Sequence, residues 1–295
     1  MPDRAQLERM IDLYLAALVA GDPGRLPLAD EAVLIENNQR IAWGEGLWGT
    51  IDAIGTYRHY FADPEAGRAG FIGTAREGGV PGIFDLLVEV RDGRIVLAES
   101  YLIRDPVGAK RFDTMGAPED VWLAAVPAAE RLSRDQLIAT ANRYFAGMQR
   151  NDGKGDYSFF DPDCNRVEHG MQTTNVKTDQ TYGHSSDTDF VKMTAENQWK
   201  TGFLGFVTEI RDRRFVAIDE ERQVVLASAM FDHDGSVRSI ELTTGKQFVL
   251  SPYFDVPRTL WIFEAFKLRQ GKLFRVEATM GEIPYGQRPP LAAAA

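Results

Sequence analysis

Apolar residues near the N-terminus recur every three or four positions, a spacing that predicts an amphipathic helix. Leu7, Ile11, Tyr14 and Leu18 fall on one face of that helix, as a period of 3.6 residues requires. Further along, apolar positions alternate with mixed ones from Phe84 to Val90, and alternation at period two is typical of strands. The N-terminal part of the chain is therefore predicted to be a helix followed by a sheet.

The same pattern restarts near the middle of the chain. Leu137, Ala141, Tyr144 and Met148 repeat the helical face, and Ser133 followed three residues later by Gln has the spacing of a capping box, so the helix is predicted to begin there. The string Gly-Arg-Ile-Val-Leu-Ala-Glu-Ser (93–100) also matches Gly-Lys-Leu-Phe-Arg-Val-Glu-Ala (271–278) without a gap. The chain is therefore predicted to hold two tandem copies of one domain.

The order of elements within each copy indicates the fold class. Helices come first and strongly alternating strands afterwards, which favours α+β over a parallel βαβ sheet. Each copy is predicted to pack its helices on a curved antiparallel sheet. The seam lies within residues 116–131, where Pro118 and Pro127 interrupt the periodicity, so the predicted domains are residues 1–131 and 132–295. The second copy carries extra loops at 173–189 and 245–257.

Composition and charge narrow the functional classes. Of 295 residues, 44% are hydrophobic and 26% are charged, which is ordinary for a globular protein. Lys and Arg number 33 against 43 Asp and Glu, a net charge of −10 that argues against nucleic acid or anionic membranes as partners. No apolar run approaches the roughly 20 residues that span a bilayer. The polar N-terminus does not resemble a signal peptide, so a cytoplasmic location is predicted.

Motifs for cofactors and metals are weak. Gly44-Glu45-Gly46-Leu47-Trp48-Gly49 fits the dinucleotide pattern G-x-G-x-x-G, but that pattern binds a pyrophosphate only between a parallel strand and its helix. The four histidines form no zinc pattern, and the single cysteine, Cys164, has no activating neighbour. Neither a cofactor nor a metal is predicted.

A predicted strand over residues 95–103 carries the first candidate site residues. Every second side chain shares one face, and three apolar members indicate that this face points at the helices, carrying Glu99 and Tyr101 inward. Two interpretations of Glu99 stay open. It assists catalysis, or it pairs with an arginine to hold the fold, as its counterpart Glu277 suggests. Tyr101 has Thr279 as its counterpart, so it marks a specialised pocket.

A second helix is predicted over residues 51–61 from apolar positions three or four apart. On this helix Tyr57 or Arg58 borders the interior. His59 lies about 100° round from Arg58, so one of these two is expected to reach the rim of the pocket. Histidine titrates near neutral pH, so His59 is a candidate proton carrier; the alternative is a surface histidine. In the second copy, the polar residues Glu168 and His169 either line a second pocket or satisfy the loop that follows.

Several longer strings carry a resemblance to a known family. They are Trp-Gly-Glu-Gly-Leu-Trp (43–48), Tyr-Arg-His-Tyr-Phe-Ala-Asp-Pro-Glu-Ala-Gly (57–67), Asn-Arg-Val-Glu-His-Gly-Met-Gln-Thr-Thr-Asn (165–175) and Arg-Asp-Arg-Arg-Phe (211–215). With the doubled arrangement, they resemble a tandem subgroup of the NTF2-like (SnoaL-like) superfamily. That subgroup includes the diarylpropane γ-formaldehyde lyases of lignin-degrading sphingomonads and similar phenylcoumaran lyases.

The resemblance implies a cofactor-independent carbon–carbon lyase acting on a small aromatic substrate. A phenolic lignin dimer would lose its benzylic hydroxide to give a quinone methide, and then release formaldehyde to leave a stilbene. Such a scheme needs an acid, a base and groups that favour the phenolate. The implied assignment has His59 and Tyr101 as acid and base, Glu99 assisting, Arg58, Arg104 and Lys110 holding the phenolate, and Tyr57, Trp43, Trp48 and Phe84 as aromatic walls.

Two other functional classes remain open. The first is an NTF2-like dehydratase or isomerase acting on another aromatic or polyketide-like molecule, which would lose water or rearrange without releasing formaldehyde. The second is a non-catalytic binding module, because a fold alone does not fix function. The sequence leaves open which copy holds the working pocket and whether the chain forms a homo-oligomer.

Overall fold

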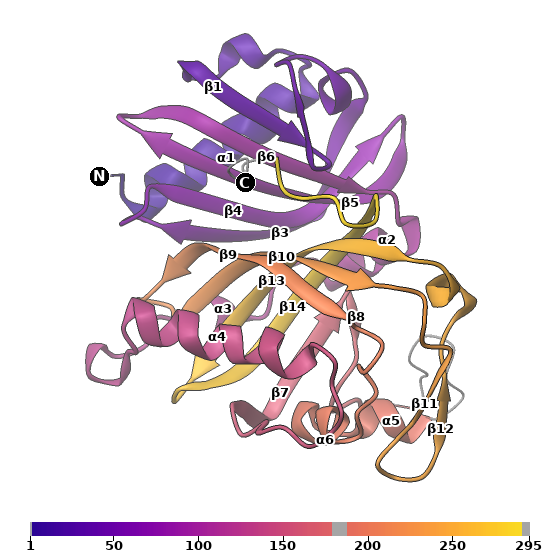
Figure 1. The fold of residues 1–295 in the computed structure, drawn as a ribbon. Coiled ribbons are helices and arrows are strands. Elements are labelled where there is room, and N and C mark those ends of the chain that lie inside the picture. The colour runs from indigo at the N-terminus through magenta and orange to yellow at the C-terminus, as the bar shows by residue number, and fades with distance from the viewer. Residues whose placement is uncertain (1, 179–187, 291–295) are drawn as a thin grey trace. The chain divides into compact units, whose positions relative to one another are not determined.

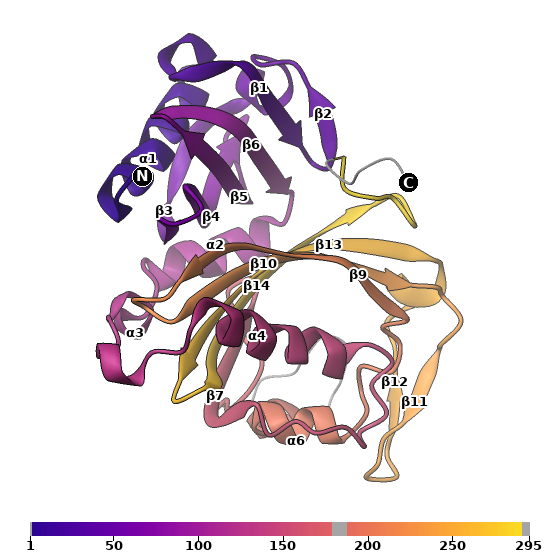
Figure 2. The same ribbon diagram turned by 60° about the vertical axis from the view of Figure 1, so that its left-hand side comes forward.

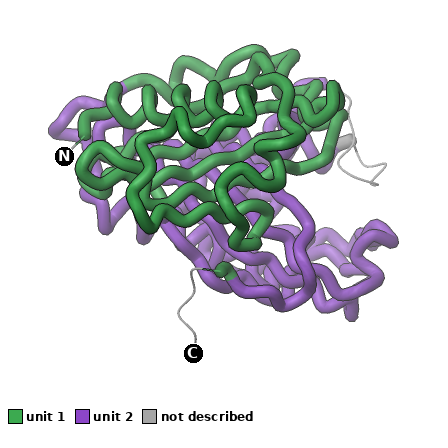
Figure 3. Tube along the Cα trace, turned by 90° about the horizontal axis from the view of Figure 1, so that it is seen from above, with its two compact units in different colours: residues 1–124, 216–219, 289–295 green, residues 125–215, 220–288 purple. Residues whose placement is uncertain are grey.

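A computed structural model describes residues 2–178 and 188–290 of the chain (Figure 1). The chain divides into two compact units, each with a six-stranded sheet. The first is built mainly from residues up to Ala124, and the second mainly from Ala125–Phe215 and Glu220–Arg288 (Figure 3). The predicted fold class, α+β with two tandem copies of helices packed on a sheet, is confirmed.

The first unit opens with the predicted helix, α1 (Arg4–Val19), which begins at a capping box formed by Asp3 and Gln6. Its sheet has the order β2-β1-β6-β5-β4-β3. The strands are β1 (Leu28–Glu36), β2 (Gln39–Ile41), β3 (Ile51–Asp63), β4 (Arg68–Glu77), β5 (Val80–Arg91) and β6 (Arg94–Ile103). Two short helices follow the sheet, α2 (Pro106–Met115) and α3 (Asp120–Leu123), and 3₁₀ turns lie at Pro23–Arg25, Gly46–Gly49 and Ala128–Glu130.

The two faces of this sheet are covered by different helices. Side chains of α1 form one core cluster with Phe84, Leu86, Ala98 and Leu102. Residues that alternate with these point to the opposite face, where α2 packs through Phe112. The first unit therefore has two buried layers, one on each face of the sheet.

The second unit repeats this order. Helix α4 (Arg134–Met148) begins at the capping box predicted from Ser133 and Gln136, and it lies across the sheet (Figure 2). The sheet has the order β8-β7-β14-β13-β10-β9. Its strands are β7 (Phe160–Glu168), β8 (Met171–Gln172), β9 (Glu209–Asp219), β10 (Val224–His233), β13 (Arg258–Arg269) and β14 (Lys272–Ile283). The other elements are α5 (Thr188–Lys192), α6 (Ala195–Lys200), the hairpin of β11 (Ser239–Glu241) and β12 (Gln247–Val249), and a 3₁₀ turn at Pro252–Asp255.

The prediction of purely antiparallel sheets is wrong. Strand β1 pairs in parallel with β6, and β7 pairs in parallel with β14, so both sheets are mixed. Period-two alternation reports only that a segment is a strand with two unlike faces, and it is the same for either direction of pairing. The alternation of apolar and polar residues therefore could not predict that β1 and β7 pair in parallel with their neighbours.

The predicted helix over residues 51–61 is also wrong, because the segment is part of strand β3. Its pairing with β4 shifts register twice, once between Ile51 and Ala53 and once between Ile54 and Arg58. Such irregularities turn side chains out of strict alternation, which produces a spacing of three to four residues. The many β-branched and aromatic residues here, and Gly55 in their midst, favour a strand over a helix.

Candidate active site

The second unit encloses a small cavity of about 90 Å³ between helix α4 and the sheet. It contains five ionisable side chains, which are Tyr144, Arg166, Glu168, His233 and Glu264. Apolar side chains form the rest of its wall, namely Met148, Leu204, Phe206, Val207, Phe231, Phe254, Leu260, Ile262, Ala278 and Met280. Two more open grooves lie elsewhere. One of about 770 Å³ is lined by helix α1 and two turns of the first sheet, and one of about 880 Å³ by strand residues and a loop of the second unit. The enclosed cavity is the candidate active site because it combines burial with titratable groups.

The sheet places two carboxylates in one row. Glu264 of β13 pairs with Ala278 of β14, which pairs with Glu168 of β7. Directly paired residues share a sheet face, so both glutamates project toward α4. The small alanine between them leaves room above the middle strand, and Glu264 itself is only 2% exposed.

Arg166 connects this row to the helix. It lies two residues before Glu168 on β7, so both side chains share a face, and the two form a buried ion pair. Arg166 Nε donates a hydrogen bond of 3.1 Å to the hydroxyl of Tyr144 on α4. Its guanidinium also lies over the ring of Trp199 from α6, 4.5 Å from the ring centroid. These contacts fix the orientation of the arginine.

Burial perturbs both Glu264 and Tyr144. Loss of solvent raises the pKa of Glu264 to about 8, an effect opposed by the hydrogen bond to Tyr144 and by the charge of Arg166, and reinforced by Glu168. Loss of solvent also holds the pKa of the Tyr144 hydroxyl well above its ordinary value. At pH 7 Tyr144 is neutral, and Glu264 is mostly protonated with a carboxylate fraction that grows toward pH 8.

An aromatic cluster covers one end of the cavity. The ring of His233 at the end of β10 stacks on Phe206, with centroids 5.1 Å apart, and lies 4.8 Å from Phe254. Its Nδ1–H donates to the backbone oxygen of Phe206, 3.3 Å away. Burial lowers the pKa of His233 to about 4, so this imidazole is neutral at pH 7. Phe206, His233 and Phe254 are called the aromatic cap below.

The corresponding row in the first unit carries different chemistry. Register pairs Leu86 with Ser100 and Ser100 with Glu36, so Leu86 occupies the place of Glu264. Two residues before Glu36 on β1, Leu34 pairs with Ala98. At the equivalent place in the second unit, two residues before Glu168, Arg166 pairs with Val276. Leu34 therefore occupies the place of Arg166, so at these two positions the first unit has leucines in place of the acid and the cation.

Tyr14 of α1 is the counterpart of Tyr144, and indole rings pack around it. Trp48 lies 5.4 Å and Trp43 6.4 Å from its ring centroid. Phe84 belongs to the same core cluster. Three of the four predicted aromatic wall residues, Trp43, Trp48 and Phe84, therefore lie together, packed against α1.

The remaining predicted residues of strand β3 are divided between the two faces. His59 is buried against Trp122 of α3, 4.9 Å away, and Phe61, 4.1 Å away. Tyr57, the fourth predicted wall residue, packs against Phe112 of α2 at 4.8 Å. Arg58 is exposed, and adjacent residues of a strand point to opposite faces. On the strand, His59 and Arg58 therefore point to opposite faces, and of the two only His59 is buried.

Glu99 and Tyr101 lie on the sheet face opposite α1, contrary to expectation. The pairing of β5 with β6 shifts register between Glu89 and Val90, so Ile95 and Ala98 both face α1 and the alternation is broken between them. Register then places His59, Ile72, Asp85 and Tyr101 in one row across β3, β4, β5 and β6. The structure thus brings His59 and Tyr101 to one face, on the two outer strands of that row.

Arg104 and Lys110 are at the surface. Arg104 Nε forms an ion pair of 2.7 Å with Glu77, and 64% of the arginine side chain is exposed. Lys110 is exposed on α2. None of the ten predicted site residues lines the cavity of the second unit, and the roles assigned to them stay predictions.

The sequence did contain a signal for the cavity. In the gapless match between the copies, Leu86 in one corresponds to Glu264 in the other, and an acid within the apolar string Trp-Ile-Phe-Glu-Ala-Phe (261–266) is unusual for a core strand. Glu168, for which the sequence left open a second pocket or support of the following loop, is among the residues that line this cavity. Arg166 and His233 were not singled out.

Within residues 2–178 and 188–290, no three His, Cys, Asp or Glu side chains come together in a way that could hold a metal ion. His184 lies outside that part of the chain. No helix in the same ranges has the length and apolar character needed to cross a bilayer.

Comparisons with known proteins give one family and several similar structures. A family model described as a domain of unknown function (DUF8021) matches residues 130–280, just over half of the chain. No curated protein matches.

Three solved structures illustrate the range of similar chains. A de novo designed protein with a curved β-sheet is 19% identical, with 39% of this chain and 97% of that chain covered and a TM-score of 0.30. An NTF2-like protein of unknown function from Burkholderia xenovorans LB400 is 15% identical, with 34% and 85% covered and a TM-score of 0.26. An LEH-like epoxide hydrolase of M. tuberculosis is 21% identical, with 39% and 94% covered and a TM-score of 0.25.

Proposed function

The chain belongs to the family of the domain of unknown function DUF8021, and on that premise we propose that its second unit is an acid–base enzyme acting on a small molecule. All residues that line the cavity fall within the matched segment, residues 130–280. The observation that carries the proposal is Glu264, a fully buried carboxyl group whose pKa is raised to about 8 inside that cavity.

A carboxyl group that titrates near neutral pH can transfer protons in both directions. Catalysis by a positioned acid or base is most effective when its pKa lies near the working pH, and it contributes about 10²–10⁴-fold in rate. Protonated Glu264 would donate to a departing hydroxyl or a carbonyl oxygen, and its carboxylate would remove a proton from carbon. Isomerisation uses both steps in turn, breaking one C–H bond and forming another, while dehydration removes one C–H and one C–OH bond as water.

Tyr144 and Arg166 supply the complementary groups. The tyrosine hydroxyl accepts a hydrogen bond from Arg166 and shares a hydrogen bond with Glu264, so it lies within reach of a substrate oxygen bound there. The cation of Arg166 would stabilise negative charge that develops on that oxygen, as an enolate or a phenolate. A fixed donor aimed at developing charge is worth about 10²–10³-fold in turnover.

Cavity size and the aromatic cap limit the substrate. Drug-sized ligands occupy sites of about 300–1,000 Å³, whereas this cavity measures about 90 Å³. It accommodates a reacting group of a few atoms, while the rings of Phe206, His233 and Phe254 would contact an apolar or aromatic remainder. The proposed substrate class is therefore a hydroxy or carbonyl compound with an apolar body.

The finer function implied by the resemblance, formaldehyde release from a phenolic lignin dimer, is a narrower version of this proposal. In that version Glu264 would act as the acid and, as its carboxylate, as the base. Tyr144 would be a neutral hydrogen-bond donor and Arg166 the cation that stabilises the phenolate, in place of the residues of the first unit. A phenolic dimer is larger than the cavity, so the aromatic cap would have to move aside for it to bind. The lyase and the dehydratase or isomerase share one site and differ in their products.

The test is an exchange and product assay. The full chain is incubated in D₂O with aromatic hydroxy ketones and, separately, with a phenolic diarylpropane diol. Mass spectrometry follows deuterium uptake and loss of water, and a formaldehyde assay follows carbon–carbon cleavage. The proposal expects turnover of at least one compound, reduced about a hundredfold by Tyr144→Phe and unchanged by the matched variant Tyr14→Phe in the first unit. Equal effects of the two variants would contradict it.

A further inference from the structure

A second concave site in the second unit is distinct from the cavity. This groove of about 880 Å³ lies where β7 and the β13–β14 hairpin meet the chain around Asn175–Thr178. Among the described residues, its lining has four cations and one carboxylate, together with three side-chain amides. The cations are Lys177, Lys192, Arg269 and Arg275, the carboxylate is Asp163, and the amides are Asn165, Gln172 and Asn175.

This charge is opposite to that of the molecule. The chain as a whole carries −10, whereas the four cations of the groove have three carboxylates beside them. Asp161 and Asp163 pair with Arg269, and Asp189 pairs with Lys192. Lys177 and Arg275 bring the other two positive charges, and they create a local field that attracts anions. Arginine forks suit the oxygens of carboxylates and phosphates, and lysines supply mobile point charges. The groove therefore combines the two cation types found at sites for oxyanions.

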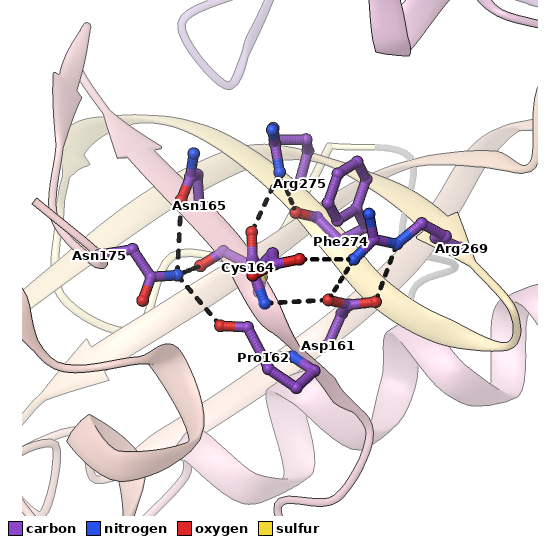
Figure 4. A network of polar contacts seen from close by, with 9 residues as sticks. Asp161, Pro162, Cys164, Asn165, Asn175, Arg269, Phe274 and Arg275 are labelled. Carbon is purple, nitrogen blue, oxygen red and sulfur yellow. Dashed lines mark hydrogen bonds and ion pairs between the residues drawn. The ribbon is translucent and has the colours of Figure 1, made fainter.

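The cations lie on two walls. On one wall, Phe274 lies between the guanidinium groups of Arg269 and Arg275, which are 3.7 and 4.0 Å from its ring centroid (Figure 4). Cation–π contacts of this kind restrict both arginines. Arg269 also binds Asp161 and Asp163, at 2.6 and 3.0 Å, which fixes its position further.

On the other wall, backbone hydrogen bonds hold the segments that carry the two lysines together. Asn175 N–H donates to the oxygen of Met193, at 2.9 Å, and Val176 N–H donates to that of Val191, at 3.0 Å. Lys177 follows the first segment and Lys192 lies within the second. Lys177 therefore follows a segment that is hydrogen-bonded to the end of helix α5, and Lys192 is the last residue of that helix. Lys192 also pairs with Asp189 of the same helix, at 3.7 Å.

An oriented amide lies between the walls. Asn175 Nδ2 donates to the side-chain oxygen of Asn165, at 3.4 Å, and to the backbone oxygens of Pro162 and Cys164. Because the oxygen of Asn165 accepts this bond, its NH₂ group points away from Asn175 (Figure 4). It offers a neutral hydrogen-bond donor to an oxyanion.

We propose that this groove binds a small organic anion that carries two or more carboxylate or phosphate groups. One anionic group would meet Arg275 and the other Lys177 and Lys192, with the Asn165 amide between them. An anion with a single charged group would contact the cations of one wall only. This site does not depend on the proposed acid–base function, because none of its residues lines the cavity.

Calorimetric titration of the full chain tests the proposal, with pyrophosphate and citrate as probes and acetate at equal ionic strength as the monoanion control. Saturable one-to-one binding of pyrophosphate or citrate, at least tenfold tighter than acetate, is expected. Whichever of the two binds identifies phosphate or carboxylate as the preferred group. No saturable binding of either, or acetate binding equally well, would overturn the proposal.

Two double variants separate the groove from general charge attraction. Lys177→Ala with Arg275→Ala should weaken binding at least tenfold, whereas Arg143→Ala with Lys154→Ala, which removes the same charge outside the groove, should change it less than twofold. Equal losses would contradict a specific site. Circular dichroism checks folding, and the single variant Asn165→Asp, which adds a carboxylate between the walls, should cause the same loss if the first double variant misfolds.

Discussion

The two units place different residues at equivalent positions of the same architecture. Where the first unit has Leu86 and Leu34 facing its helix, the second has Glu264 and Arg166. Around the shared tyrosine, the first unit packs two indole rings, whereas the second has a cavity with an ion pair beside it. One copy uses this layer for packing and the other holds ionisable groups there at a cost in stability.

The comparison shows how few residues separate a core from a candidate active site. Two leucines in the first unit, Leu86 and Leu34, correspond to an acid, Glu264, and a cation, Arg166, in the second. Because an unpaired buried charge costs several kcal/mol, the second unit needs the whole set of Arg166, Glu168, Tyr144 and a protonated Glu264. Arg166 without Glu168 would be a buried charge without its ion-pair partner.

The largest expected effect is on catalysis by the second unit. Glu264→Gln keeps the size of the side chain and removes its titrating proton, so turnover should fall about 10²–10⁴-fold. The matched variant Glu36→Gln in the first unit changes a carboxyl group that accepts a 2.8 Å hydrogen bond from Leu47 N–H. It should leave turnover within twofold. The exchange assay compares both variants, and a similar loss in both would place catalysis outside the cavity.

The next effect is on stability. Arg166→Leu copies Leu34 of the first unit and leaves Glu168 without its buried partner, which should lower the free energy of unfolding by about 3–5 kcal/mol. The double variant Arg166→Leu with Glu168→Leu removes both charges and should recover most of that loss. Chemical denaturation measures all three chains. A single variant as stable as the unchanged chain would show that this ion pair is not a stabilising feature.

A smaller effect is expected on the pH dependence of the free energy of unfolding, through His233 of the aromatic cap. The pKa of His233 falls from 6.5 to about 4 on folding, so the unfolded chain binds a proton first as the pH drops. Above pH 6.5 this histidine does not change the free energy of unfolding. Between pH 6.5 and pH 4 its protonation in the unfolded chain lowers the free energy of unfolding by about 1.4 kcal/mol per pH unit. His233→Phe keeps a ring between Phe206 and Phe254 and should reduce the slope. Unfolding curves between pH 4 and 7 that show the same slope in both chains would contradict this assignment.

The smallest effect is expected for the residues assigned from the sequence to the first unit. Arg104→Ala breaks an exposed ion pair with Glu77, and such pairs contribute about 0–1 kcal/mol. Neither stability nor turnover should change much. His59→Phe keeps an aromatic ring against Trp122 and should leave turnover within twofold. A hundredfold loss from His59→Phe with normal folding would favour the original assignment and place the working site in the first unit.

The sequence predicted the architecture better than the site. Helical spacing and capping at Ser133 gave the helices, and the match of residues 93–100 with 271–278 gave the duplication. Register shifts within the strands made the predictions about β3 and about the face of β6 wrong. Register shifts in β3 gave its apolar residues a spacing like that of a helix. The shift between Ile95 and Leu97 placed Glu99 and Tyr101 on the sheet face opposite α1. The cavity depends on which strands become neighbours, and only pairing of β7, β14 and β13 brings Glu168 and Glu264 into one row.

The most direct measurement of the central claim is the titration of Glu264 itself. Carbon-13 NMR of the full chain labelled at glutamate carboxyl groups, with Glu264→Gln to assign the signal, follows ionisation between pH 4 and 9. Burial in the cavity predicts a pKa of about 8 for this carboxyl group. A pKa of about 4.3, the ordinary value for glutamate, would contradict the account.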